Sequence, residues 1–148
     1  MKVYEVEGIK DILESNNIVW QELESKPELF QYNHYMRFCY DIERDDIQDI
    51  ISKIYDDQLF KVSKFYALKL FAQQYPLRQY EEPYEYTSKI NRHYICIKVD
   101  KDSRFCTEDN IYIPEVGQEF IVDPDSMYSI YNNGTEEAIY LVVDILKN

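Results

Sequence analysis

The side chains of this chain that could do chemistry are few, and the two histidines, His34 and His93, come first among them. Imidazole is a common general base and metal ligand near neutral pH. His93 lies three residues before Cys96, and no other cysteine is so close to a histidine in the sequence. Residues three apart on a strand point to opposite faces. The pair therefore does not predict a thiolate nucleophile activated by a neighbouring base.

Neighbouring carboxylates are the second kind of candidate. Glu81–Glu82, or Asp123 with Asp125, could be read as a pair for general acid–base chemistry. Asp123 and Asp125 flank a proline, however, and this pattern is typical of a solvated turn. Asp100–Asp102 lacks the glycine and the closing glutamate of a calcium loop, and no phosphate-loop, dinucleotide or zinc spacing is present. The residues alone predict no catalytic residues, no metal and no cofactor.

The charge of the chain limits its partners. It has 28 acidic and 16 basic side chains, for a net charge of −12. Residues 1–60 and 105–148 are each strongly acidic, whereas residues 61–104 are basic. An acidic surface repels phosphate backbones, so we expect no direct nucleic-acid binding. It would attract a basic protein partner or mimic the charge of a nucleic acid.

The cysteines and the hydropathy pattern indicate an intracellular protein. Cys39, Cys96 and Cys106 are odd in number and widely spaced, which is typical of free thiols in a reducing compartment. No apolar run approaches the ~20 residues that span a membrane, and the start of the chain alternates apolar and charged residues instead of resembling a signal peptide. We expect a cytoplasmic protein that does not contact membranes.

The elements that would position these residues form one α+β domain over 1–148. A helical and edge-strand part covers 1–60 and a β-rich part covers 61–148. Ile47, Ile50, Ile51 and Ile54 form one apolar stripe of a helix capped by Asp45 or Asp46. Shorter helices are expected at Ile9–Ser15 and Val19–Glu24. Strands are expected at Met1–Val6, His34–Ile42, Phe65–Phe71, Arg92–Val99, Ile111–Ile113, Glu119–Val122, Met127–Tyr131 and Ala138–Leu146.

Turn signals join the later strands. Gly117 marks one turn, and Asn132-Asn133-Gly134 predicts a hairpin because Asn and Gly tolerate positive φ. The last strand is apolar almost throughout, as expected where both faces are covered. Short strands at close spacing favour a sandwich or barrel buttressed by the helices.

The segment from Glu115 to Asp144 resembles the closing part of the aspartyl/asparaginyl β-hydroxylase-like oxygenases. The resemblance rests on Gly117, Asp123, Ser129-Ile130, Asn132 and Leu141–Asp144. Upstream, Asn91–Ile95 resembles the family's Arg-x-His strand, whose histidine helps to hold the co-substrate. The resemblance covers about residues 65–146. It implies a double-stranded β-helix, a cupin-like jelly roll, in an enzyme that uses iron and 2-oxoglutarate.

The chain departs from that family where its chemistry is done. The resemblance places the distal iron-ligating histidine at Tyr128 and the arginine that pairs with 2-oxoglutarate near Ala138. The proximal histidine and carboxylate would lie near Tyr80 and Glu82. A facial iron site needs two imidazoles, and a guanidinium fork is what grips a carboxylate bidentately. We therefore expect a lost iron site, with Tyr80, Glu82, His93 and Tyr128 lining the residual co-substrate pocket.

Three functions follow from these patterns. The first is a non-catalytic protein-interaction module on a degenerate oxygenase-type jelly roll, with an acidic, Tyr-rich surface that binds a protein partner. The second is an active iron- and 2-oxoglutarate-dependent hydroxylase with an atypical site, for example His93 with carboxylates. The third is an acidic nucleic-acid mimic, of the kind that a phage could encode. Edge strands often pair with other chains, so a homo-oligomer is a further expectation.

Overall fold

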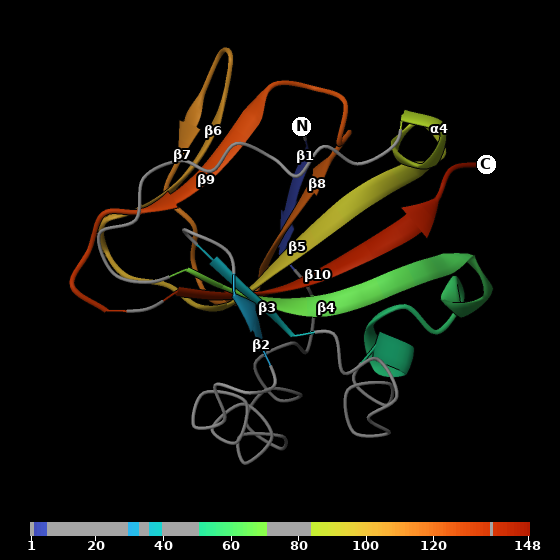
Figure 1. Ribbon diagram of the computed structural model, residues 1–148, viewed down its shortest axis with the longest axis horizontal. Helices are drawn as coiled ribbons and strands as arrows, with labels where there is room; N and C mark the ends of the chain where they lie inside the picture. Colours follow the sequence, from blue (N-terminus) through green and yellow to red (C-terminus); the bar gives the residue numbers. More distant parts are fainter. Residues whose placement is uncertain (1, 6–29, 33–35, 40–50, 71–83, 137) are drawn as a thin grey trace.

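The computed structural model describes residues 2–5, 30–32, 36–39, 51–70, 84–136 and 138–148, and the fold is built from two facing β-sheets (Figure 1). The strands expected from the sequence form a double-stranded β-helix, the jelly roll that the family resemblance implies. A short helix, α4 (Tyr84–Thr87), leads into strand β5.

The larger sheet has seven strands, in the order β1-β8-β5-β10-β4-β3-β2, and all neighbours are antiparallel. Its strands are β1 (Lys2–Glu5), β2 (Phe30–Tyr32), β3 (Met36–Cys39), β4 (Val62–Leu70), β5 (Ile90–Lys98), β8 (Gln118–Val122) and β10 (Ala138–Leu146). As predicted, β10 lies at the centre, and every residue from Ala138 to Ile145 is buried. A strand buried on both faces reads as a continuous apolar run, which is why the sequence located it well.

The smaller sheet has three described strands, in the order β7-β6-β9. They are β6 (Ser103–Thr107), β7 (Ile111–Tyr112) and β9 (Tyr128–Asn132). The sequence predicted β7 and β9 but missed β6, because Ser103, Arg104 and Thr107 interrupt its apolar pattern. Burial explains the strand: Ser103 and Phe105, which the alternation places on one face, are both fully buried, and Phe105 packs into the core.

The turn predicted at Gly117 is confirmed, whereas the hairpin predicted at Asn132-Asn133-Gly134 is wrong, because β9 and β10 lie in different sheets and the segment connects the two sheets. Gly117 precedes β8 with a φ of 92°, a conformation that glycine adopts without strain. After β9, the backbone N–H of Gly134 donates to the side-chain oxygen of Asn132. A side chain at Gly134 would collide with the carboxylate of Asp100, so the glycine is needed for close packing.

The two faces of the larger sheet carry different side chains. The inner face looks onto the smaller sheet, and the core between them contains Leu68, Leu70, Tyr94, Cys96, Phe105, Phe120, Val122, Ile130, Ala138, Tyr140 and Val142. Because side chains alternate along a strand, the outer face carries His93, Ile95, Glu119, Leu141 and Val143, which are also buried. Cys96 in the core and Cys106 on β6 are free thiols, as expected.

Part of the outer face is covered by the end of the predicted stripe helix. Residues 51–54 are helical; Ile51 is buried, and Tyr55 beyond them contacts the sheet. A short 3-10 helix (η2, Leu59–Lys61) then leads into β4. The helices expected at Ile9–Ser15 and Val19–Glu24, and the stripe helix before Ile51, lie outside the described residues. Within the described ranges, no helix is long and apolar enough to cross a membrane.

Candidate functional site

Tyr128 occupies the position where the resemblance places the distal iron-ligating histidine, and its side chain lies inside the jelly roll. Its hydroxyl is 2.8 Å from the hydroxyl of Tyr94 on β5. Its ring stacks on Phe105 (centroids 5.9 Å apart, planes 8° apart), and Phe105 stacks on Phe120 (4.5 Å, 2°). Three parallel rings and Tyr94 therefore fill this part of the interior.

Ala138 and Tyr140 line the same interior from β10. Ala138, where the family's arginine would stand, is fully buried in the core. The Tyr140 hydroxyl is also buried, and no described residue gives it a hydrogen-bond partner. Burial raises the pKa of the Tyr140 phenol well above its ordinary value, so it stays protonated. Neither residue carries the guanidinium that binds a carboxylate through two parallel hydrogen bonds.

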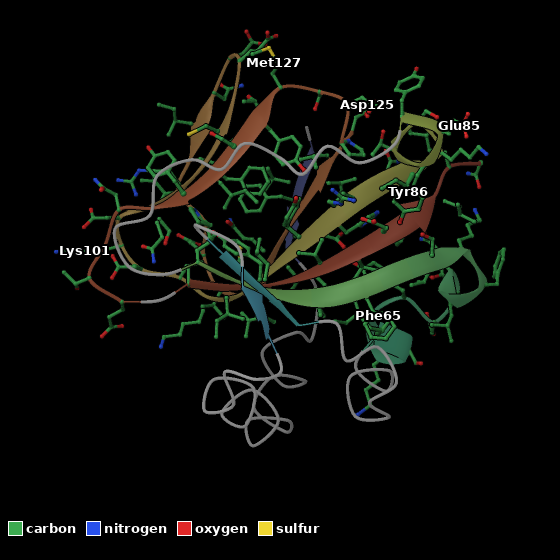
Figure 2. All side chains as sticks on the ribbon, in the orientation of Figure 1. Phe65, Glu85, Tyr86, Lys101, Asp125 and Met127 are labelled. Carbon is green, nitrogen blue, oxygen red and sulfur yellow. The ribbon has the colours of Figure 1, made fainter. Side chains whose placement is uncertain are left out.

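A buried ion pair that the sequence did not reveal closes one end of the interior. Arg92 on β5 donates from Nε and Nη2 to the two carboxylate oxygens of Asp144 on β10, at 2.7 and 2.9 Å. The two residues are directly opposite in the register. The hydroxyl of Tyr86 donates to the same carboxylate at 2.7 Å and contacts Ser63 (Figure 2). The guanidinium is thus committed to a fixed internal partner.

Burial raises the pKa of Tyr86, an effect that the neighbouring Asp144 carboxylate reinforces although the Ser63 hydroxyl opposes it. The phenol therefore stays protonated and remains a donor to Asp144. This cluster, together with the ring stack, occupies the inner surface between β5, β10 and the smaller sheet.

His93 follows Arg92 on β5 but points to the outer face. Its Nδ1 lies 3.0 Å from Oε2 of Glu119 on β8, and the Tyr55 hydroxyl donates to that same oxygen. The rings of Tyr55 and His93 meet edge to face, with centroids 5.5 Å apart. Burial, and then the charge of Glu119, raises the pKa of Tyr55, so this phenol also remains a donor. We call these three residues the Tyr55–Glu119–His93 cluster.

The structure does not bring the expected pocket residues together. His93 lies on the outer face of the larger sheet and Tyr128 lies inside the jelly roll, so the two cannot line one pocket. The physical reason is the strand alternation: Tyr94, next to His93, is the residue that contacts Tyr128. Tyr80 and Glu82, the other two expected residues, lie outside the described residues, as does His34.

An open cleft of about 440 Å³ lies beside the Tyr55–Glu119–His93 cluster. His93 lines it, with Ile121 and Ile145 as apolar neighbours and Lys61, Lys147 and Asn91 among its polar ones. The sequence did not reveal this site, because Tyr55 and Glu119 are 64 residues apart and belong to different elements. A glutamate near the start of a strand such as β8 reads as a residue that faces solvent, so it gave no sign of its burial.

The iron that the sequence resemblance implies does not fit the described side chains. No three His, Cys, Asp or Glu residues among them gather closely enough to hold a metal ion. The chain has two histidines, and His93 is bound to Glu119 on the outer face. At most one imidazole is therefore left for the interior, where a facial iron site would need two.

Comparisons with known proteins support the fold. No protein-family profile matches the chain, and no curated protein is detectably similar to it in sequence. Among solved structures it is similar to the viral collagen prolyl hydroxylase of Paramecium bursaria Chlorella virus-1, solved as a 2OG complex (TM-score 0.63, 9% identity, 100% of this chain and 97% of that one). It is also similar to a prolyl-4-hydroxylase of Pseudomonas putida (TM-score 0.58, 8% identity, 99% and 92%). At these identities the likeness establishes a shared double-stranded β-helix fold.

Proposed function

We propose that this chain is a non-catalytic protein-interaction module on the jelly roll of the 2-oxoglutarate oxygenases, a degenerate relative of the aspartyl/asparaginyl β-hydroxylase-like enzymes. One observation carries the proposal. Tyr128, at the expected iron-ligand position, forms a hydrogen bond with the Tyr94 hydroxyl, and its ring stacks on Phe105. A ring held on two sides belongs to the packing of the core, where it stabilises the fold instead of binding a ligand.

The missing iron and co-substrate groups support the same proposal. His93 is committed to Glu119 outside the interior, and a phenol with an ordinary pKa near ~10 is a poor ligand for ferrous iron at neutral pH. Ala138 has no polar group to offer the co-substrate, and Arg92, the nearest guanidinium along β5, is bound to Asp144. A hydroxylase would need both functions.

Anaerobic titration with Fe(II) and 2-oxoglutarate tests the loss of catalysis. The structurally similar viral prolyl hydroxylase was solved as a complex with 2OG, so 2-oxoglutarate is the first compound to test. We expect no saturable spectral change with Fe(II) plus 2-oxoglutarate, and no release of succinate after air is admitted. Binding with turnover of the co-substrate would overturn the proposal and restore the atypical hydroxylase.

The smaller sheet offers a surface for the partner. Ile111, Ile113 and Met127 are 70%, 61% and 72% exposed. Figure 2 places Met127 at the end of the smaller sheet, by the tip of the β6–β7 hairpin. We call these three residues the β7 rim. Exposed apolar side chains gathered in one place mark interaction sites more often than scattered ones do.

Exposed carboxylates lie close to the β7 rim in the sequence. Glu108, Asp109, Glu115 and Asp125 are all exposed, and residues 105–148 carry nine acids against one base. The partner that complements this surface is a basic protein with an apolar anchor side chain. β7 is also the edge of its sheet within the described strands, so its backbone could pair with an extended segment of that partner.

Quantitative affinity capture with matched variants tests the partner surface. The variant Ile111→Ser/Met127→Ser removes the apolar anchors of the β7 rim. Tyr84→Ser, on α4 and 71% exposed, is the control at a different surface. We expect the double variant alone to lose a basic protein, by about tenfold, and high salt to weaken the capture. Equal capture by both variants would show that the β7 rim is not the site.

A further inference from the structure

We propose that the cleft beside His93 binds a small hydroxylated anion, with Nε2 of His93 accepting a hydrogen bond from a ligand hydroxyl. The cleft lies on the outer face of the larger sheet. It is therefore separate from the jelly-roll interior and from the β7 rim, and the inference does not depend on the proposed function.

The contact with Glu119 determines the tautomer of His93. A carboxylate can only accept hydrogen bonds, so the Nδ1 that lies 3.0 Å from Glu119 carries a hydrogen. In the neutral imidazole, Nε2 is then the acceptor. The Tyr55 hydroxyl donates to the same carboxylate oxygen and holds it in place. The cluster thus presents one oriented nitrogen lone pair.

A ligand in the cleft can reach the His93 side chain. His93 is 8% exposed, and its side chain lines the cleft. No described residue forms a hydrogen bond with Nε2, whereas Nδ1 is bound to Glu119. A volume of about 440 Å³ is within the range of small-molecule sites, which combine an apolar floor with a few convergent polar groups. An oriented acceptor beside such a space selects a ligand that donates a hydrogen bond.

The charged side chains that line the cleft favour an anion. Lys61 and Lys147 both line the cleft, against one side-chain carboxylate, that of Asp123. Lys147 lies 3.6 Å from Asp123, both partly exposed, and the Lys61 ammonium contacts the Asn148 side-chain oxygen. An exposed ion pair at 3.6 Å is weak, and the Asn148 side chain is uncharged. An anion can therefore compete with Asp123 for Lys147 and with Asn148 for Lys61. Asn91 and Gln58 add amide groups that can bond further hydroxyls.

The ligand class follows from these groups together. It needs a hydroxyl for Nε2 of His93, an anionic group for the two lysines, and a carbon skeleton small enough for the cleft. A hydroxy acid and a hydroxylated phosphate ester both meet these requirements, and they share the recognised chemistry. The floor of Ile121 and Ile145 accommodates the carbon chain.

NMR titration of the His93 ring tests the proposal. In the His34→Gln variant, His93 is the only histidine, so the imidazole signals are assigned without ambiguity. Glycerate and glycerol 3-phosphate are the probes, added up to about 10 mM. Propionate lacks the hydroxyl and glycerol lacks the charge, so they are the controls. We expect a saturable shift with at least one probe, and at least a tenfold weaker effect with each control; the stronger probe identifies the anionic group.

Lysine variants separate binding from structure. Lys61→Gln/Lys147→Gln changes two side chains at the mouth of the cleft and leaves the buried cluster intact, whereas Lys101→Gln is a matched control at the opposite end of the molecule from Tyr86 (Figure 2). We expect the double variant to weaken the probe about tenfold or more, and the control to bind as the parent does. No saturable shift with either probe, equal shifts with the controls, or undiminished binding by the double variant would each overturn the proposal.

Discussion

Two consecutive residues of β5, Arg92 and His93, each meet a carboxylate, but on opposite faces of the same sheet. Arg92 binds Asp144 inside the jelly roll, where the two side chains are 5% and 0% exposed. His93 binds Glu119 on the outer face, where the values are 11% and 12%, and it also lines a cleft. The inner pair uses both carboxylate oxygens, whereas His93 of the outer pair lines an open cleft.

The difference shows that the two faces of one strand can place a charged pair in different surroundings. On the inner face, aromatic rings fill the interior and the ion pair is closed, so that face supports the fold. On the outer face, His93 lines the cleft in which we propose a ligand site.

The largest expected effect comes from breaking the inner pair. Arg92→Met removes two hydrogen bonds and one positive charge from the fully buried Asp144 carboxylate. We expect the free energy of unfolding to fall by about 3–5 kcal/mol, measured by urea denaturation. Lys147→Met, which removes the exposed partner of Asp123, is the control and should cost less than about 1 kcal/mol. Similar losses in both variants would mean that the inner pair is not buried as described.

Breaking the outer cluster should cost less. Glu119→Leu leaves two donors, the Tyr55 hydroxyl and Nδ1–H of His93, without their acceptor. We expect a loss of about 1–3 kcal/mol in the same urea assay, because water in the cleft can reach the His93 ring. The exposed Glu115→Leu is the matched control and should change stability by less than about 0.5 kcal/mol. A larger loss than that of Arg92→Met would reverse the comparison between the two faces.

The buried tyrosines predict a loss of stability at high pH from both faces. The pKa of Tyr140 inside and of Tyr55 outside is raised by burial. Above pH ~10 the unfolded chain releases these protons while the folded chain retains them, so stability is complete below pH ~10 and declines above it. Each tyrosine should contribute a slope of about 1.4 kcal/mol per pH unit until its folded pKa is reached.

Urea denaturation at pH 9, 10 and 11 measures this slope. Tyr140→Phe and Tyr55→Phe should each reduce the slope of stability against pH by about 1.4 kcal/mol per pH unit, the contribution of one tyrosine. At neutral pH, Tyr140→Phe should be close to neutral, because no described partner of its hydroxyl is lost. An unchanged slope in both variants would show that neither phenol stays protonated in the fold.

The sequence predicted the sheets better than the sites, and the reason is physical. Strands such as β10 are specified by local apolar runs, so their ranges can be read along the chain. The inner pair joins residues 52 apart, and the outer cluster joins residues 64 apart, so their contacts depend on register between strands. The alternation of side chains along β5 shows that His93 points to the opposite face from Arg92 and Tyr94. Only the fold shows which of these two faces is the interior.

The family resemblance misled the pocket prediction for the same reason. It assigned His93 and Tyr128 by motif position, and a motif does not record to which face of the sheet a side chain points. β6 was missed because one buried residue, Phe105, carries its core contact. That residue then forms the centre of the ring stack, which could not be foreseen from a strand that was not expected.

The smallest expected effect concerns Tyr128 and decides whether it belongs to the core. Tyr128→Phe removes the hydroxyl that lies 2.8 Å from that of Tyr94 but keeps the ring on Phe105. If packing is its role, the loss should be about 1 kcal/mol, that of one hydrogen bond, in urea denaturation. Tyr84→Phe, exposed on α4, is the control and should be neutral. A much larger loss would mean that the hydroxyl, and not the ring, holds the interior together, and the inner face would then be a polar site like the outer one.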